Sequence, residues 1–162
     1  HVAHERILYE KALKAMEEKN APSQQLLFPT PVFISPEDML VLTEILPYLE
    51  RVGFGIQEFG KNTVLIQSVP MDIKIGREKV VLLEMIGLYK ETGQAENVAK
   101  ENVAKVYACS SAMKAGEKLT PQEMASLVDQ LFATENPYFC PHGRPIVITL
   151  TLEELDKRFG RE

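Results

Sequence analysis

The sequence predicts a mixed α/β (α+β) fold in which helices outnumber strands. Apolar residues recur at helical spacing in several segments that carry recognisable caps, whereas β-type alternation is confined to one hairpin and a few single strands. The composition is 45% hydrophobic and 25% charged, as in ordinary globular domains. A chain of 162 residues therefore has room for one compact domain, or for two small lobes that share a core.

In the N-terminal half, a helix is predicted over residues 1–20 because its apolar residues fall on one helical stripe and a charged tail follows. Prolines then punctuate a predicted loop, residues 20–34, that runs into a strand. Ser35 is a predicted N-cap followed by proline and two acids, and we expect this helix to end or kink at Pro47. Residues 54–69 alternate around a Gly-Lys-Asn turn and predict a β-hairpin.

In the C-terminal half, helices are predicted at residues 77–93 and 95–116 because each segment is closed by a glycine. Capping boxes, in which a Thr is followed three residues later by a Glu, begin two more helices at residues 120 and 151. A short strand is predicted between them, at residues 146–150. Because a lone hairpin and single strands form a poor sheet, we expect these strands to pair across the sequence and further strands to lie upstream of the first residue.

The charge and the cysteine content exclude some classes of function. The net charge of −5 gives no general electrostatic attraction to nucleic acid, so any DNA contact is expected to be local, weak or delivered by a partner. No apolar run approaches the ~20 residues of a membrane span. Two cysteines form no disulfide framework and predict reduced intracellular thiols, either buried or metal-bound. Because the chain begins with His rather than Met, we also expect natural sequence upstream.

Nearly all of the cysteine and histidine falls in three places, which together form a candidate metal site. His1 and Glu5 are four residues apart on the first predicted helix and therefore share a face. Cys140 and His142 lie two residues apart in an extended loop, which directs both side chains to the same side. With Cys109 from a later helix, these donors make a mixed nitrogen, oxygen and sulfur set that suits zinc.

Each part of this set also has a simpler structural interpretation. Cys109 on an apolar helix face would serve as core packing. The His1–Glu5 pair would belong to a solvated face, and the Cys140–His142 pair would only form hydrogen bonds within its loop. Sequence spacing does not establish whether the three places meet, so composition and spacing leave both interpretations open.

Three motifs resemble the C-terminal domain of the MutL family of mismatch-repair proteins. "HVAHERILYE" resembles the end of the motif DQHA-x2-E-x4-E, with Val2 in place of Ala. "ACSSAMKAG", residues 108–116, resembles the family's A-C-R segment, with Ser110 in place of Arg. "CPHGRP", residues 140–145, matches the final motif in full. The motifs occur in the family's order, span the whole chain and are those of the endonuclease-competent branch.

The resemblance implies metal ligands and catalytic residues at the matching positions. The matching metal ligands are His1, Glu5, Cys109, Cys140 and His142. His1 and Glu5 are also expected to act in catalysis, with Glu10 on another side of the helix in a supporting or structural role. The Asp of the family's motif would lie before His1. Arg144 is expected either to hold a phosphate or to pair with a carboxylate, and His4, at a variable motif position, to lie on the surface.

The activity implied by the resemblance is that of a metal-dependent endonuclease that nicks one strand of duplex DNA by phosphodiester hydrolysis. Zinc suits the thiolate ligands, and manganese or magnesium suits the hydrolytic step. The implied partners are a second copy of the chain in a homodimer, the sliding clamp, the mismatch-recognition protein MutS through the full-length protein and, weakly, duplex DNA. The implied location is the bacterial cytoplasm near the nucleoid. The alternative is a non-catalytic homodimerisation and clamp-binding module with a structural zinc site.

The resemblance also implies a division into two lobes. Residues 1–18 and 96–162 are expected to form a dimerisation and catalytic lobe, and residues 19–95 an inserted regulatory lobe. The long helices predicted at residues 1–20 and 95–116 would bridge the two.

Residues 23–31, "SQQLLFPTP", carry one more resemblance. The string from Gln24 to Pro29 resembles the sliding-clamp motif, a Gln followed by aliphatic or aromatic anchors. It implies that Gln24, Leu27 and Phe28 contact the clamp. The structural alternative is an edge strand whose apolar residues belong to the core.

Overall fold

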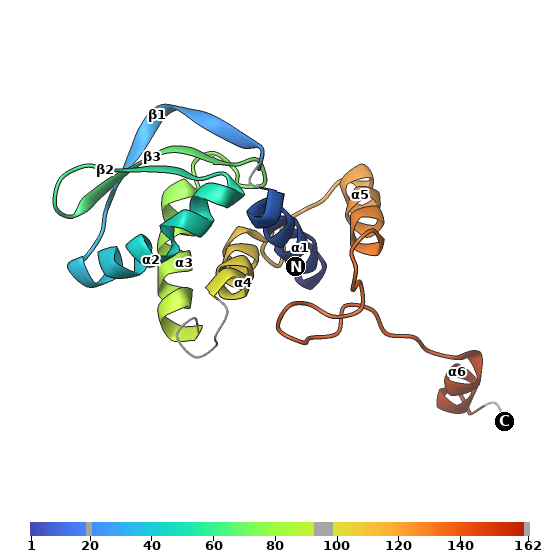
Figure 1. Ribbon diagram of the computed structural model, residues 1–162. Coiled ribbons are helices and arrows are strands. Elements are labelled where there is room, and N and C mark those ends of the chain that lie inside the picture. The colour runs from blue at the N-terminus through green and yellow to red at the C-terminus, as the bar shows by residue number, and fades with distance from the viewer. Residues whose placement is uncertain (19–20, 93–98, 161–162) are drawn as a thin grey trace.

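The computed structural model describes residues 1–18, 21–92 and 99–160 (Figure 1). Within these residues the chain forms a mixed α+β domain of six helices and a three-stranded antiparallel sheet. The helices are α1 (Val2–Glu18), α2 (Pro36–Val52), α3 (Glu78–Thr92), α4 (Ala99–Ser111), α5 (Pro121–Phe132) and α6 (Leu152–Arg158). The strands are β1 (Ser23–Phe33), β2 (Gly55–Glu58) and β3 (Thr63–Pro70).

The sheet has the order β1-β3-β2, and the hairpin predicted at residues 54–69 is confirmed as β2 and β3. Helices α2 and α3 lie on one side of the sheet (Figure 1). Val32, Val64 and Ile66 are fully buried, since alternate residues of β1 and β3 turn toward these helices. The hairpin therefore gains its stability from the helical layer and from β1, which pairs with it from a distant part of the sequence.

Strand β1 takes up most of the segment predicted as a loop. Its register jumps between Gln25, opposite Ser68, and Thr30, opposite Ile66, so that the residues between them bulge away from the ladder. A proline lacks the N–H that a ladder needs, and β1 tolerates the prolines of this segment because it is an edge strand with a bulge.

The core lies where α1 and α4 pack together and meet α2, α3 and the sheet (Figure 1). The residues of α1 and α4 in this core are Leu8, Ala12, Met16, Val103, Ala104, Val106, Tyr107 and Ala108. The small alanines on both helices allow a close approach of α1 to α4. This contact brings Glu5 of α1, with His1 directly before the helix, close to Cys109 of α4.

Helix α2 does not end at Pro47 but continues to Val52. Pro47 removes one hydrogen bond of the helix, whereas Ile45 and Leu49 on either side of it are fully buried and hold the helix against the core. The helix ends instead at Gly53, whose φ of 108° provides a left-handed cap.

The prediction that this helix continues to Gly116 is wrong, because α4 ends at Ser111. The carboxylate of Glu117 accepts the backbone N–H of Lys114 at 2.7 Å and stabilises a turn after the helix. Gly116 lies in this turn with a φ of 89°. The predicted closing residue Gly93 and the predicted helix start at residue 95 lie outside the described residues.

The strand predicted at residues 146–150 is wrong. Within the described residues this segment has no partner strand, and only an isolated bridge between Phe139 and Pro145 precedes it. Ile148 and Leu150 are exposed. An apolar β-type run does not form a strand where no ladder is available to satisfy its backbone groups.

Residues 120–160, which we call the C-terminal arm, lead away from the rest of the chain (Figure 1). Both capping boxes are confirmed, at Thr120 for α5 and at Thr151 for α6. Leu131 and Cys140 are the only buried residues among those described in the arm. No helix within the described ranges is long and apolar enough to cross a membrane.

Candidate metal centre

His1 directly precedes α1, and its carbonyl accepts the N–H of Glu5 at 2.9 Å, so the two residues lie one turn apart on one face, as the spacing predicts. His1 Nε2 lies 2.8 Å from Glu5 Oε1. Glu5 is only 1% exposed, so its carboxylate lies inside the protein rather than on the solvated face that the simpler interpretation required. A buried carboxylate needs compensation by hydrogen bonds or by a positive charge.

The loop that carries Cys140 and His142 is held tightly by its own backbone. The N–H of Cys140 donates to the carbonyl of Arg144 at 2.9 Å, and that of Gly143 donates back to the carbonyl of Cys140 at 2.9 Å. Gly143 has a φ of 80°, a backbone conformation that residues with a side chain rarely adopt. This turn presents Cys140 and His142 together toward α1.

The three places of the sequence meet around the carboxylate of Glu5. Glu5, Cys140 and His142 each offer one potential ligand atom, and these three atoms lie within 4.8 Å of one another. His142 Nδ1 is 3.7 Å from Glu5 Oε2, and Cys109 Sγ is 3.8 Å from Glu5 Oε1. One carboxylate oxygen therefore faces His1 and Cys109, and the other faces His142.

Two features of this cluster fit a bound cation, an unsatisfied carboxylate oxygen and an oriented imidazole. Glu5 Oε2 is buried and has no hydrogen-bond partner. His1 Nδ1 lies 2.8 Å from the carbonyl of Met113, and when this nitrogen donates its proton there, the lone pair of Nε2 points at Glu5. Metal-binding histidines are commonly oriented by such a bond from the other ring nitrogen. The donor set of imidazole, thiol and carboxylate is the one that zinc prefers.

The electrostatics of Cys109 point the same way. Burial, and then the negative charge of Glu5, raise the pKa of the Cys109 thiol above its ordinary value. A thiolate at Cys109 and a carboxylate at Glu5 therefore repel each other unless a positive charge lies between them. Arg144 is exposed and close enough to oppose this rise in the pKa slightly.

Glu10 lies apart from this cluster. Its carboxylate accepts the backbone N–H groups of Glu135 at 2.8 Å and of Asn136 at 3.3 Å. These bonds attach the start of the Cys140 loop to α1.

The residues predicted to contact a clamp lie on β1, in the sheet. Leu27 and Phe28 are 88% and 80% exposed, so the alternative that places them in the core is wrong for both. The amide of Gln24 donates to the carbonyls of Pro70 at 3.2 Å and of Ile73 at 2.6 Å. Gln24 is therefore engaged within the domain, which its resemblance to a clamp-contacting Gln did not predict.

Sequence reasoning missed two features next to the cluster. Arg6 is 9% exposed and donates from Nε to the carbonyl of Phe139, the residue before Cys140, at 2.6 Å. His4, expected on the surface, is partly buried, and its Nδ1 accepts the N–H of Met113 at 3.0 Å. Both contacts use backbone groups of distant segments, and the only signal in the sequence is the spacing of Arg6 from Glu10 on one helix face.

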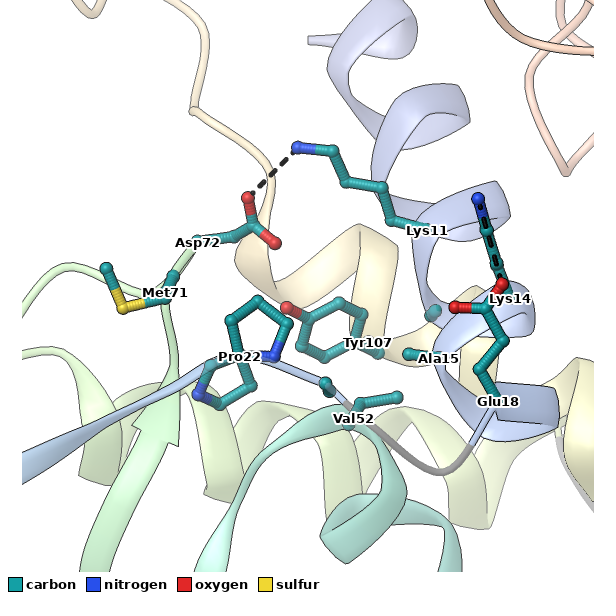
Figure 2. A pocket seen from close by; sticks show the side chains of 12 residues that line it. Lys11, Lys14, Ala15, Glu18, Pro22, Val52, Met71, Asp72 and Tyr107 are labelled. Atoms are coloured by element: carbon teal, nitrogen blue, oxygen red, sulfur yellow. Dashed lines mark hydrogen bonds and ion pairs between the residues drawn. The ribbon is translucent and has the colours of Figure 1, made fainter.

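Two pockets of ≈ 360 Å³ differ in their relation to the cluster. One is lined by Cys109 and His142 together with polar side chains such as Lys105. The other, shown in Figure 2, lies between α1 and the end of β3 and contains none of the candidate ligands. In this second pocket Lys11 contacts Asp72 at 3.3 Å. Because candidate ligands line the first of the two pockets and not the second, the first is the better candidate for access to the cluster.

Comparison with known proteins places the chain in a family. A family model described as the MutL C-terminal dimerisation domain matches residues 1–119. The chain is 47% identical over its whole length to "DNA mismatch repair protein MutL" of Pelodictyon phaeoclathratiforme, and 51% identical over 99% of its length to the protein of the same name from Chloroherpeton thalassium. It spans about a quarter of these relatives, 26% and 25% of their lengths. The chain therefore belongs to the MutL C-terminal dimerisation domain family.

Proposed function

We propose that this domain is the metal-dependent endonuclease and homodimerisation domain of a mismatch-repair protein, and that it nicks one strand of duplex DNA. The observation that carries the proposal is the cluster of Glu5, Cys140 and His142, whose potential ligand atoms lie within 4.8 Å of one another around a buried carboxylate. His1 and Cys109 complete the set from the other oxygen of Glu5.

The candidate ligands have different roles in the proposed metal site. His1, Glu5, Cys109, Cys140 and His142 would hold zinc, and the oxygens of Glu5 would also serve manganese or magnesium. Bound divalent metal would acidify a coordinated water and offset the charge of the scissile phosphate. Glu5 would hold the two groups of ligands in place relative to each other, because one of its oxygens faces His1 and the other faces His142.

The pocket beside the cluster offers a path for a DNA strand. Lys105, Cys109 and His142 all line it, so a phosphate that enters would lie beside a cation and two of the candidate ligands. Arg144 is a second candidate for phosphate contact because its side chain is exposed on the loop that carries Cys140 and His142. A domain with a net charge of −5 attracts DNA poorly, and this favours recruitment by a partner, with MutS acting through the full-length protein.

The bulge of β1 is the proposed contact for the sliding clamp. Leu27 and Phe28 project as exposed apolar anchors, and a peptide-in-groove contact would bury them. To contact the clamp, Gln24 would have to give up its hydrogen bonds to the carbonyls of Pro70 and Ile73. The loss of these bonds would weaken the contact with the clamp. Changing Gln24 and Phe28 to Ala should abolish stimulation of nicking by the clamp and leave metal content unchanged. Normal stimulation of the folded double variant would reject this contact.

Homodimerisation is proposed to use the apolar surface of the C-terminal arm. Met124, Val128 and Phe132 follow one another at intervals of four residues on α5 and are all exposed. Such a stripe on a helix is typical of an interface. In the proposed two-lobe division, this arm belongs with residues 1–18 to the dimerisation and catalytic lobe, and residues 19–95 form the regulatory lobe.

The direct test is nicking of supercoiled plasmid by the full-length protein with manganese. Glu5→Ala should abolish nicking, because the variant loses the carboxylate at the centre of the set. Glu18→Ala, a matched change at an exposed position of the same helix, should nick normally. If the unmutated protein does not nick although it contains zinc and forms dimers, the site is a structural zinc site in a non-catalytic dimerisation and clamp-binding module.

A further inference from the structure

We propose that Arg6 is a positioning residue for the candidate metal centre and acts through the backbone of the loop that carries Cys140 and His142. This role presupposes the metal centre proposed above. Arg6 touches none of the candidate ligands' donor atoms in the contacts described, so it would hold the ligands in place rather than bind the ion.

The bond from Arg6 to the loop is short, buried and charge-assisted. Nε donates to the carbonyl of Phe139 at 2.6 Å, and that carbonyl belongs to the residue directly before Cys140. Arg6 is 9% exposed, so little solvent competes for this bond. The guanidinium also lies 5.5 Å from the ring centre of Tyr9, which fixes its plane on a second side.

Glu10 extends the same attachment upstream. Arg6 Nη1 is 3.4 Å from Glu10 Oε1, and the carboxylate of Glu10 accepts the N–H groups of Glu135 and Asn136. Two side chains one turn apart on α1 thus bind the backbone over residues 135–139. The positive group takes a carbonyl and the negative group takes N–H donors, so each is matched to its partner.

This arrangement sets the distance between the ligands. Glu5 precedes Arg6 on α1 and is turned from it by ~100°, so one rigid helix carries both a ligand and the tie to the loop. The loop moves as a unit because Ile146 N–H donates to the carbonyl of Tyr138 across it. Fixing the carbonyl of Phe139 therefore fixes Cys140 and His142 relative to Glu5.

A lysine at position 6 would reproduce the hydrogen bonds of Arg6 only in part. The guanidinium uses Nε for the carbonyl and Nη1 for the carboxylate, whereas an ammonium is a single point donor. Arg6→Lys should therefore give a smaller defect than Arg6→Gln. The matched control is Arg51→Gln, because Arg51 also donates to a backbone carbonyl of α1, that of Met16 at 3.4 Å.

The test uses two measurements on the full-length protein well below its unfolding temperature. The first is the rate at which iodoacetamide alkylates Cys140 in the metal-free protein, read by peptide mass spectrometry. The second is the Kd for zinc, read by competition with a chromophoric chelator. Arg6→Gln should raise the rate at least about tenfold and the Kd about 10–100-fold, the usual range when a partner of a metal ligand is lost. Arg51→Gln should change neither.

The outcomes separate this role from the metal centre itself. Unchanged alkylation and unchanged zinc Kd in a folded Arg6→Gln protein would overturn the role of Arg6, as would equal changes in Arg51→Gln. If the unmutated protein binds no zinc while Arg6→Gln still exposes Cys140, the proposed metal centre is rejected. The proposal that Arg6 holds the Cys140 loop is then supported. If Arg6→Gln does not fold, Arg6→Lys and Glu10→Gln must both raise the alkylation rate, and failure of either to do so overturns the proposal.

Discussion

Residues 1–119, which we call the body, and the C-terminal arm of residues 120–160 keep their structure by different means. The described part of the body buries a continuous apolar core formed by its helices and its sheet. The described arm buries only Leu131 and Cys140 and leaves a series of apolar side chains in solvent. The body is therefore a folded unit in the usual sense, whereas the arm depends on a few polar attachments and on surfaces that another molecule would have to cover.

The candidate metal centre lies at the seam between these two regions. Glu5 and Cys109 come from helices of the body, and Cys140 and His142 come from the arm. The family model matches the body alone, and the relatives match along the whole chain, arm included. A metal ion bound by both regions would act as a joint, and this is the central claim of our account.

The largest effect is expected in the core of the body. Leu8 on α1 is fully buried, so Leu8→Ala should lower the free energy of unfolding by about 3 kcal/mol. Leu152 on α6 is 79% exposed, and Leu152→Ala should change it by less than about 0.5 kcal/mol. Chemical denaturation followed by circular dichroism measures both values. Similar losses of unfolding free energy in the two variants would contradict the proposed difference between body and arm.

The next effect concerns self-association through the arm. Phe132 lies at the end of the apolar stripe on α5, and Phe132→Ala should weaken the dimer by about 2 kcal/mol, roughly 30-fold in Kd. Phe59→Ala, an equally exposed phenylalanine between β2 and β3 in the body, is the control and should have no effect. Sedimentation equilibrium gives the two constants. A weaker dimer only in the Phe59 variant would move the interface to the body.

The smallest effect is a pH dependence at the end of the body, just before the arm begins. The hydrogen bond from Lys74 at 2.8 Å, and then the N–H of Lys114, lower the pKa of Glu117 from 4.5 to about 2. Because the folded-state pKa is the lower one, this contribution to stability is present above pH ~4.5 and is lost as the pH falls through about 2.

Glu117→Gln should therefore unfold at a slightly lower temperature than the unmutated protein at pH 6 and at the same temperature near pH 2. The difference is small because the pair is exposed to solvent. Calorimetry at several pH values follows it. A difference that grows toward low pH would contradict the sign of this argument.

Local signals in the sequence predicted much of the fold. The capping residues Ser35, Thr120 and Thr151 begin helices because each side chain satisfies a backbone N–H within the next turn, which is a purely local contact. The strand at residues 146–150 failed because a strand depends on a partner that its own sequence does not specify. Pro47 failed as a helix end because the buried residues on either side of it outweigh its local preference.

The candidate site divides in the same way. The spacing of His1 from Glu5 predicted a shared helix face, and the structure places His1 Nε2 2.8 Å from Glu5 Oε1. That Cys109 and the Cys140 loop meet this face followed from the family resemblance and not from spacing. Arg6 and His4 were missed because their partners are backbone groups of Phe139 and Met113, which no residue type in the sequence marks.

The most direct test of the joint between body and arm is the zinc content per chain, measured by elemental analysis for the unmutated protein and for Cys140→Ser. Cys140 is the one buried thiol of the arm, and its replacement removes a soft ligand without adding bulk. Our account predicts that the unmutated protein contains zinc and that the content falls sharply in the variant. A zinc content that is the same in both proteins would contradict it, since the arm would then contribute no ligand.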